Sequence, residues 1–323
     1  MQSNKPNVTK NNALLVFAGL IAALVMLTSF VMALSKFDDG GKIDESSLFE
    51  SSEESVEESV AESSEPQEES GGYAYYGKFE MENHPRLNSD VVNGPLAIVK
   101  GDNGKFPNVD QASLVNVSKK KTSNIYGLSN TSLVMYEEAI VNIDRFIVSF
   151  YDYLPKNGLI IDKAYTTPEA VTLSDPNMDL ATGYSVKLFV YNSSYNFGSE
   201  EFAYLKDQAF RYGVIQRYPE NKESYTGFEA NGSIYRYVGL AHSAYMNHYR
   251  HSLEEYIDKI RTNKVIEFES ELEENVSYVV YYVPLSASVE TTYVPLPTDP
   301  DYTYTISGDG SSGFIVTVRV PTK

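Results

Sequence analysis

The residue types that most often carry catalysis or bind metals are scarce in this chain. Its 323 residues include four histidines and no cysteine. The lack of cysteine excludes disulfides, thiolate zinc sites, iron–sulfur clusters and cysteine nucleophiles. His248 and His251 lie three residues apart and could share a helix face, but His242 lies six residues before His248, and no HExxH motif occurs. We therefore interpret His242 as a packed scaffold residue and the other two as solvated.

Other reactive arrangements are also weak. No GxSxG motif occurs, and the glycine-rich run 308–313 lacks the lysine and the following helix of a phosphate loop, so it predicts a turn. Arg217 and Arg236 could bind a carboxylate, but arginines on strands more often pair with internal acids. The 26 tyrosines could stack on sugars, although their spacing mostly follows core faces and favours packing.

Charge is distributed unevenly along the chain. The 26 basic and 44 acidic side chains give a net charge of −18, which argues against nucleic-acid binding. Residues 37–72 hold 13 acidic residues and one lysine, and so account for −12 of this total. A segment this charged and this poor in apolar residues cannot bury enough surface to offset its chain entropy. We predict a disordered Ser/Glu-rich spacer over residues 36–72.

An uncharged run of 22 residues, 13–34, precedes this spacer. It is long enough to cross the core of a bilayer, and we predict a single-pass transmembrane anchor over residues 13–35. Lys5 and Lys10 predict that residues 1–12 stay cytoplasmic, which places the C-terminal domain outside the cell membrane. The alternative is a signal peptide cleaved near residues 33–35, although the apolar region of such peptides is usually shorter.

Residues 73–263 carry the patterns of a folded domain. Apolar residues spaced three and four apart predict a helix over 133–154. A second helix is predicted over 199–212, with Ser199 as its N-cap and Gly213 as its C-terminal cap. A third follows the capping box Ser252–Glu255. Strands are predicted at residues 158–162, 184–191, 214–218 and 235–238, and a short helix from residue 240.

From residue 264 the pattern changes to strands alone. Residues 276–283, 289–294, 302–306 and 314–320 have strand patterns, separated by prolines and by the glycines at 308–310. The prolines are Pro284, Pro295 and Pro297. We predict a β-rich C-terminal appendage over 264–323, which either packs on the preceding domain or adds strands to its sheet.

Residues 202–257 contain the segments RYGVIQRYPENKESYTGF, IYRYVGLAHSAYM and SLEEYI. Together these three segments resemble the D-alanyl-D-alanine carboxypeptidase family of the VanY type. Members of this family are zinc peptidases that trim the stem peptide of peptidoglycan. The order of the family motifs can be followed over residues 95–260 and is clearest over 202–257. The resemblance implies an α+β fold with a small antiparallel sheet flanked by helices.

The same resemblance places unexpected residues at the family's chemical positions. Matched to the SxHxxGxAxD motif, MDLATGYSVK puts Leu180 at a zinc-binding histidine and Lys187 at a zinc-binding aspartate. Matched to the ExxH motif, NGSI puts Asn231 at the general base and Ile234 at the other histidine, and the arginine of an SGYRS-like strand end falls on Thr166. Leucine and isoleucine have no lone pair, an ammonium group repels a cation, and an amide does not accept a proton as a carboxylate does. We therefore predict no zinc, no other cofactor and no catalytic residue at these positions.

Three functions remain open. The first is a membrane-tethered pseudo-peptidase that binds peptidoglycan or a cell-wall protein. The second is an active metallo-D,D-carboxypeptidase that trims stem peptides with displaced zinc ligands. The third is a structural or adhesive surface protein whose cleft is filled. A closed apolar centre around Leu180 and Ile234 would favour the third function, and an open polar cleft would favour ligand binding.

Overall fold

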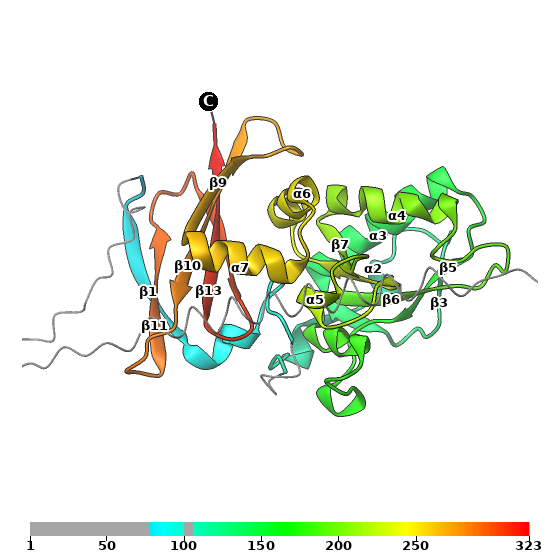
Figure 1. The fold of residues 1–323 in the computed structure, drawn as a ribbon, viewed down its shortest axis with the longest axis horizontal. Helices are drawn as coiled ribbons and strands as arrows, with labels where there is room; N and C mark the ends of the chain where they lie inside the picture. Colours follow the sequence, from blue (N-terminus) through cyan, green and yellow to red (C-terminus); the bar gives the residue numbers. More distant parts are fainter. Residues whose placement is uncertain (1–77, 100–105, 323) are drawn as a thin grey trace, which may run out of the picture. The chain divides into compact units, whose positions relative to one another are not determined.

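A computed structural model describes residues 78–99 and 106–322 (Figure 1). These residues belong to one compact unit that spans Glu69–Lys323. The predicted transmembrane anchor over 13–35 and the predicted spacer over 36–72 lie outside the described residues. Within the described ranges, no helix is both long enough and apolar enough to span a membrane.

A five-stranded sheet lies at the centre of the part of this unit that precedes the C-terminal strands. In spatial order its strands are β3 (Gly127–Leu128), β5 (Leu159–Lys163), β6 (Ser185–Val190), β8 (Asn231–Tyr237) and β7 (Val214–Tyr218). Neighbouring strands are antiparallel, as predicted, except that β3 and β5 are parallel. A parallel pair needs a crossover connection, and helix α3 (Glu137–Tyr153) lies in that connection.

Helix α3 packs on this sheet with the apolar stripe predicted from the sequence. Its buried side chains share one hydrophobic core with Val186 and Leu188 of β6. The helix begins at Glu137 rather than at residue 133, because Val134–Tyr136 form strand β4, which pairs with β2 (Leu114–Asn116). The buried members of the stripe are Ile140, Ile143, Ile147 and Phe150, and Phe146, outside the predicted stripe, is buried as well.

The helix predicted over 199–212 is divided into three short pieces. They are the 3₁₀ helix η6 (Glu200–Phe202), helix α4 (Ala203–Gln208) and the 3₁₀ helix η7 (Ala209–Tyr212). The Ser199 hydroxyl makes no capping bond and instead accepts a hydrogen bond from the backbone N–H of Asn196 (3.0 Å). Gly213 ends the segment in the left-handed region, with φ of 72°, as the sequence predicts.

Helices α6 (Leu240–Tyr249) and α7 (Leu253–Asn263) follow strand β8. Helix α7 begins with the predicted capping box: the Ser252 hydroxyl accepts from the N–H of Glu255 (3.3 Å), and the Glu255 carboxylate accepts from the N–H of Ser252 (2.7 Å). The remaining short helices are η1 (Asn88–Val92), η3 (Gln111–Ser113), α2 (Val117–Lys120), η4 (Pro168–Ala170), η5 (Pro176–Thr182) and α5 (Glu223–Thr226).

The C-terminal residues form a separate antiparallel sheet. In spatial order its strands are β12 (Thr303–Gly308), β13 (Gly313–Pro321), β10 (Val276–Pro284) and β9 (Val265–Glu269). Strand β9 has no counterpart among the predicted strands. The glycine-rich run between β12 and β13 is a turn, as predicted, in which the Asp309 carboxylate accepts backbone hydrogen bonds from Ser311 (2.7 Å) and Ser312 (2.8 Å).

A further strand pair joins residues from both sides of the boundary predicted at residue 263. Strand β1 (Met81–Leu87) pairs with β11 (Thr291–Pro297) in antiparallel fashion. The expectation that Pro295 and Pro297 end a strand is wrong, because both lie within β11. Proline is tolerated there since, among the described sheets, β11 has a paired strand on one side only. We call β1 together with β9–β13 the β-module.

The β-module packs on helix α7 and does not extend the five-stranded sheet. Ile257 and Ile260 of α7 share a hydrophobic core with Val280 of β10 and Ile315 of β13. Leu96, from the segment after η1, joins the same core. Of the two arrangements considered for the C-terminal strands, the structure contains the packed one.

The capping box of α7 gives a test of this fold. Replacing Ser252 by alanine should lower the free energy of unfolding by about 1 kcal/mol, because the N–H of Glu255 loses its acceptor. The measurement is urea denaturation of the purified protein. Ser224→Ala, at an exposed position of α5, is the matched control and should change stability by less than about 0.5 kcal/mol. Equal midpoints for both variants would contradict the capping role.

Candidate functional site

The five positions predicted to be altered all lie on or beside the five-stranded sheet. Lys187 of β6 and Ile234 of β8 are direct cross-strand partners. Leu180 lies in η5, just before β6, and its carbonyl accepts the N–H of Thr166 (3.4 Å). Asn231 is the first residue of β8, three residues before Ile234. The structure therefore brings Lys187 beside Ile234, and Thr166 beside Leu180.

The side chains at these positions are engaged in local structure. Leu180 and Ile234 are fully buried, with 0% exposure each. The Thr166 hydroxyl donates to the carbonyl of Ala164 (3.2 Å). The side-chain oxygen of Asn231 accepts from both the N–H (2.9 Å) and the hydroxyl (2.7 Å) of Ser233. The amide at the position predicted for the family's general base is thus held in a local turn.

This residue set does not fit a catalytic zinc ion. Such an ion needs about three nitrogen, oxygen or sulfur ligands from the protein and an open position for water. Leu180 and Ile234 offer none, and the ammonium of Lys187 repels a cation. Among the residues that the structure describes, no three His, Cys, Asp or Glu side chains gather closely enough to hold a metal ion elsewhere.

The histidines lie apart from these positions. His242 is buried between two hydroxyl groups, those of Tyr256 (2.7 Å) and Thr317 (3.0 Å), so its predicted scaffold role agrees with its contacts. Burial lowers the pKa of His242 to about 3, which keeps its ring neutral. His248 is exposed beside Glu271 (2.6 Å), and His251 is partly buried.

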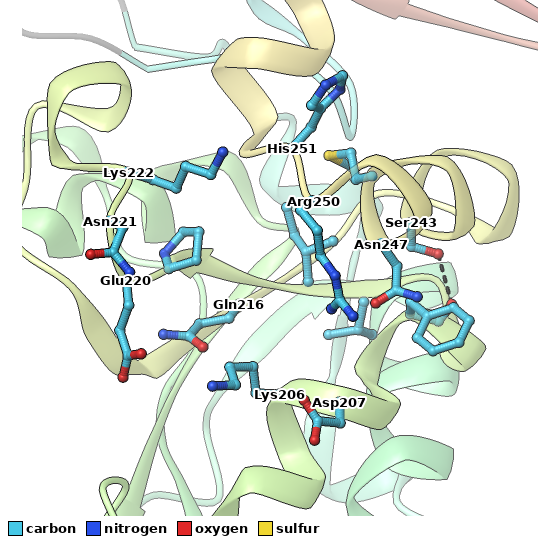
Figure 2. Close-up of a pocket in the computed structure, with 15 residues that line it drawn as sticks. Lys206, Asp207, Gln216, Glu220, Asn221, Lys222, Ser243, Asn247, Arg250 and His251 are labelled. Atoms are coloured by element: carbon cyan, nitrogen blue, oxygen red, sulfur yellow. Dashed lines mark hydrogen bonds between the residues drawn. The ribbon is translucent and has the colours of Figure 1, made fainter.

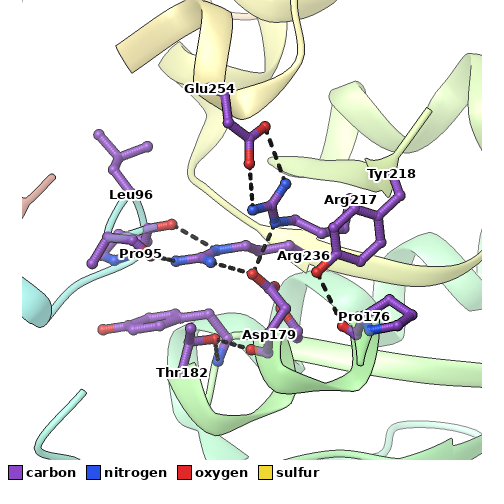
Figure 3. Close-up of polar contacts among 12 residues, drawn as sticks. Pro95, Leu96, Pro176, Asp179, Thr182, Arg217, Tyr218, Arg236 and Glu254 are labelled. Atoms are coloured by element: carbon purple, nitrogen blue, oxygen red, sulfur yellow. Dashed lines mark hydrogen bonds and ion pairs between the residues drawn. The ribbon is translucent and has the colours of Figure 1, made fainter. Parts of the chain in front are cut away.

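A buried network of charges joins η5, β7, β8 and α7 (Figure 3). One oxygen of Asp179 accepts hydrogen bonds from Arg217 Nε and from Arg236, each at 2.8 Å. Arg217 also holds both oxygens of Glu254, at 2.7 and 3.2 Å. All four side chains are at most 2% exposed. Two guanidinium groups and two carboxylates thus form a neutral cluster without water contact.

The network also satisfies backbone groups of a distant segment. Arg236 donates to the carbonyls of Pro95 (3.0 Å) and Ala97 (2.8 Å), while the second oxygen of Asp179 accepts from the Ser185 hydroxyl. Burial alone would raise the pKa of the Asp179 carboxyl, but the guanidinium groups of Arg236 and Arg217 outweigh it and hold this pKa below its usual value. Asp179 is therefore a carboxylate at neutral pH.

Sequence reasoning identified one half of this network. Pairing with internal acids was the favoured interpretation for Arg217 and Arg236, and the structure confirms it. It missed Asp179 and Glu254 as the partners. Asp179 directly precedes Leu180 in the matched motif, and Glu254 lies in SLEEYI, so both were visible in the sequence, but their burial was not.

Among the cavities on the described residues, two lie elsewhere on the unit. The larger, of about 560 Å³, lies between the β-module and the elements β8 and α6. The smaller, of about 260 Å³, lies beside edge strand β7, where Figure 2 shows Arg250, Gln216 and Lys206 around it. Neither cavity is lined by any of the five positions predicted to be altered.

Comparison with known proteins decides the family. No family model matches the sequence. The chain is 30% identical over 249 residues to a D-alanyl-D-alanine carboxypeptidase of Enterococcus faecium, an alignment that covers 71% of this chain and 76% of the relative. The chain belongs to the D-alanyl-D-alanine carboxypeptidase family. A shorter stretch of 51 residues is 45% identical to the bifunctional D-Ala-D-Ala dipeptidase and carboxypeptidase VanXYC of Enterococcus gallinarum, over 16% of this chain and 27% of that protein.

A solved structure shows the same fold. The vancomycin resistance D,D-dipeptidase VanXYg, in complex with a D-Ala-D-Ala phosphinate analogue, superposes with a TM-score of 0.58 at 21% identity. The match covers 74% of this chain and 99% of that one. The resemblance inferred from residues 202–257 is confirmed as family membership. The finer assignments at Thr166, Leu180, Lys187, Asn231 and Ile234 remain predictions.

The buried network predicts an acid-dependent stability. Asp179→Asn should lower the free energy of unfolding by about 3 kcal/mol or more, because it leaves two buried guanidinium groups undercompensated. The carboxylate stabilises the fold at pH values above its unfolded pKa of about 3.9, and this contribution is lost as pH falls through the lower folded value. The difference between the urea midpoints of the parent and the variant should therefore be constant from pH 7 to about pH 5 and should narrow below about pH 4.

An exposed carboxylate provides the control. Asp258→Asn removes one of the partners of Arg261 on the surface of α7, which keeps its ion pair with Asp309, and should change stability by less than about 1 kcal/mol at pH 7. A difference between parent and Asp179→Asn that stays constant down to pH 3 would contradict the role given to the carboxylate.

Proposed function

We propose that this chain is a catalytically inactive member of the D-alanyl-D-alanine carboxypeptidase family that binds peptidoglycan outside the cell membrane. The transmembrane anchor predicted over residues 13–35 holds it to the membrane, and the acidic spacer over 36–72 sets the folded unit at a distance. Family membership supports the wall as its place of action, and the residues at the altered positions support the loss of catalysis.

The observation that carries the proposal is the nature of the Leu180, Lys187 and Ile234 side chains. Two of the three are aliphatic and fully buried, and the third carries a positive charge directly across from Ile234. These side chains would provide no set of ligands for a zinc ion. Asn231 occupies the position of the general base, and its amide, which accepts a hydrogen bond from Ser233, would not take a proton from a zinc-bound water as a carboxylate would. These positions therefore provide neither the zinc ligands nor the general base that hydrolysis by the family's mechanism requires.

Displaced zinc ligands are the main alternative. They would require a cluster of ligating side chains elsewhere. Three of the four histidines are held in separate environments: His242 between two hydroxyls, His248 beside Glu271, and His84 in β1 beside Glu82. Their separation favours the inactive form over an active metallo-D,D-carboxypeptidase.

A structural or adhesive surface protein is the second candidate. The complete burial of Leu180 and Ile234 favours it, because these side chains fill space that would otherwise be open. In that case the protein would bind a cell-wall protein through its surface and would have no affinity for peptidoglycan. Pull-down with purified peptidoglycan sacculi separates the two candidates.

Zinc content and activity test the loss of catalysis. The purified full-length chain, dialysed against trace zinc, should retain far less than one zinc per chain, and it should release no D-alanine from a stem pentapeptide. The combined variant Leu180→His, Lys187→Asp and Ile234→His restores three ligating groups at these positions and should gain zinc. About one zinc in the parent, together with D-alanine release, would overturn the proposal.

A matched variant controls for nonspecific zinc binding by an added histidine. Phe189→His places a histidine on the same strand, β6, at an exposed position outside the predicted ligand set. It should bind no more zinc than the parent. Equal zinc uptake by this control and by the restored variant would show that the predicted positions are not a ligand set.

A further inference from the structure

The smaller cavity lies beside β7, which is an edge strand of the five-stranded sheet. It is lined by residues of β7, of helix α6, of the segment formed by α4 and η7, and of the loop that follows β7. Its volume of about 260 Å³ is slightly below the range of pockets that hold drug-sized ligands. The cavity therefore suits a small ligand that lies along the edge of the sheet.

The backbone of β7 faces this cavity at Gln216. The N–H of Val238 donates to the carbonyl of Gly213 (2.8 Å), so Gly213 is paired with the β8 side. Hydrogen-bonded and non-hydrogen-bonded pairs alternate along an antiparallel ladder. Ile215 therefore also bonds to β8, and the N–H and C=O of Gln216 point away from it. An edge strand with such free backbone groups can pair with a further strand.

The side chain of Gln216 is already engaged within the sheet. Its Nε2 donates to the carbonyls of Tyr218 (3.1 Å) and Asn231 (3.3 Å), where the register of the β7–β8 pair shifts. These bonds hold the residue in place. What Gln216 offers to a ligand is therefore its backbone, which any peptide can pair with whatever its side chains are.

Charged side chains of both signs line the cavity without partners. Within the described part of the chain, Lys206 and Arg250 form no ion pair, and Asp207 and Glu220 form none either. Lys222, in contrast, is held by a carboxylate of α7 (2.7 Å). Asp207 directly follows Lys206 in α4 and offsets part of its charge. Arg250 is therefore the main cation available to a ligand, and Glu220 is the main anion.

These two charges lie on either side of the free backbone groups. Figure 2 shows Gln216 between Glu220 on one side and Arg250 on the other. Glu220 belongs to the loop after the C-terminal end of β7, whereas Arg250 directly follows helix α6. A short peptide has the complementary order of groups: an ammonium at one end, backbone N–H and C=O in the middle, and a carboxylate at the other end.

We infer that this cavity binds a short extended peptide with both ends free, which pairs with the backbone of Gln216 as an added strand antiparallel to β7. Arg250 holds the C-terminal carboxylate of the peptide, and Glu220 holds its N-terminal ammonium. Backbone pairing supplies hydrogen bonds, and the two charged ends fix the direction of the peptide. The inference goes beyond the proposed function, because this site is separate from the five positions predicted to be altered and does not require binding of peptidoglycan.

Binding of a simple tripeptide tests this directly. The probe is tri-L-alanine, titrated into the purified full-length chain by calorimetry, and it should bind. Its C-terminal amide and its N-acetyl derivative should each bind about tenfold more weakly, because each lacks one charge-assisted contact. Bound tripeptide should also slow the hydrogen exchange of the backbone N–H of Gln216, measured by mass spectrometry on fragments that contain β7, because that N–H gains an acceptor.

Two variants assign the ends of the peptide. Arg250 has a φ of 57°, in the left-handed region that glycine adopts readily, so Arg250→Gly should keep the fold. This variant should bind the tripeptide and its C-terminal amide with equal affinity. Glu220→Gln should bind the tripeptide and its N-acetyl derivative with equal affinity. Arg145→Ala, at an exposed arginine of α3 outside the lining, is the matched control and should retain both preferences.

Loss of each preference in its own variant, with both retained in the control, supports the site. Three results would overturn it: no binding of the tripeptide, equal affinity of the parent for the tripeptide and its amide, or an unchanged preference in Arg250→Gly. Binding without slower hydrogen exchange in β7 would also overturn it, because the peptide would then not be an added strand.

Discussion

The carboxylate of Asp179, held between two buried arginines, is the contact on which the arrangement of the other elements depends. Through Arg217 it joins η5 to β7 and to Glu254 of α7, and through Arg236 it joins η5 to β8 and to the backbone at Pro95 and Ala97. Burying four charged groups is costly, and the cost is offset only when every partner is in place. The network therefore enforces one relative position of these segments.

That constraint also fixes two of the positions at which the sequence predicts a departure from the family pattern. Leu180 follows Asp179 directly, and Ile234 lies two residues before Arg236, so the ionic network positions both aliphatic side chains. Apolar neighbours keep water away from the charges and so strengthen their attraction. A family scaffold can thus be held together by its ion pairs independently of any metal, and its function has to be argued from the site rather than from the fold.

Local patterns predicted most of the elements around this network. The apolar stripe of α3, the capping box of α7 and the glycine after η7 depend on residues a few positions apart, and each was found where the sequence placed it. The errors have non-local causes. The helix predicted from residue 133 begins later because β4, at its predicted start, pairs with β2. Pro295 and Pro297 lie within a strand because β1, from the opposite end of the unit, pairs with β11.

The sequence by itself indicated the family, the longer helices, most of the longer strands, and the residue types at the five positions matched to the family's chemical residues, since all of these follow from side-chain identity and spacing. Only the tertiary structure decided that Asp179 and Glu254 meet Arg217, that Leu180 and Ile234 are fully buried, and that the β-module packs on α7 and borders a tyrosine-lined cavity. Burial and long-range pairing depend on which distant segments come together. That choice is made by the free energy of the whole packed unit and cannot be seen in any local pattern.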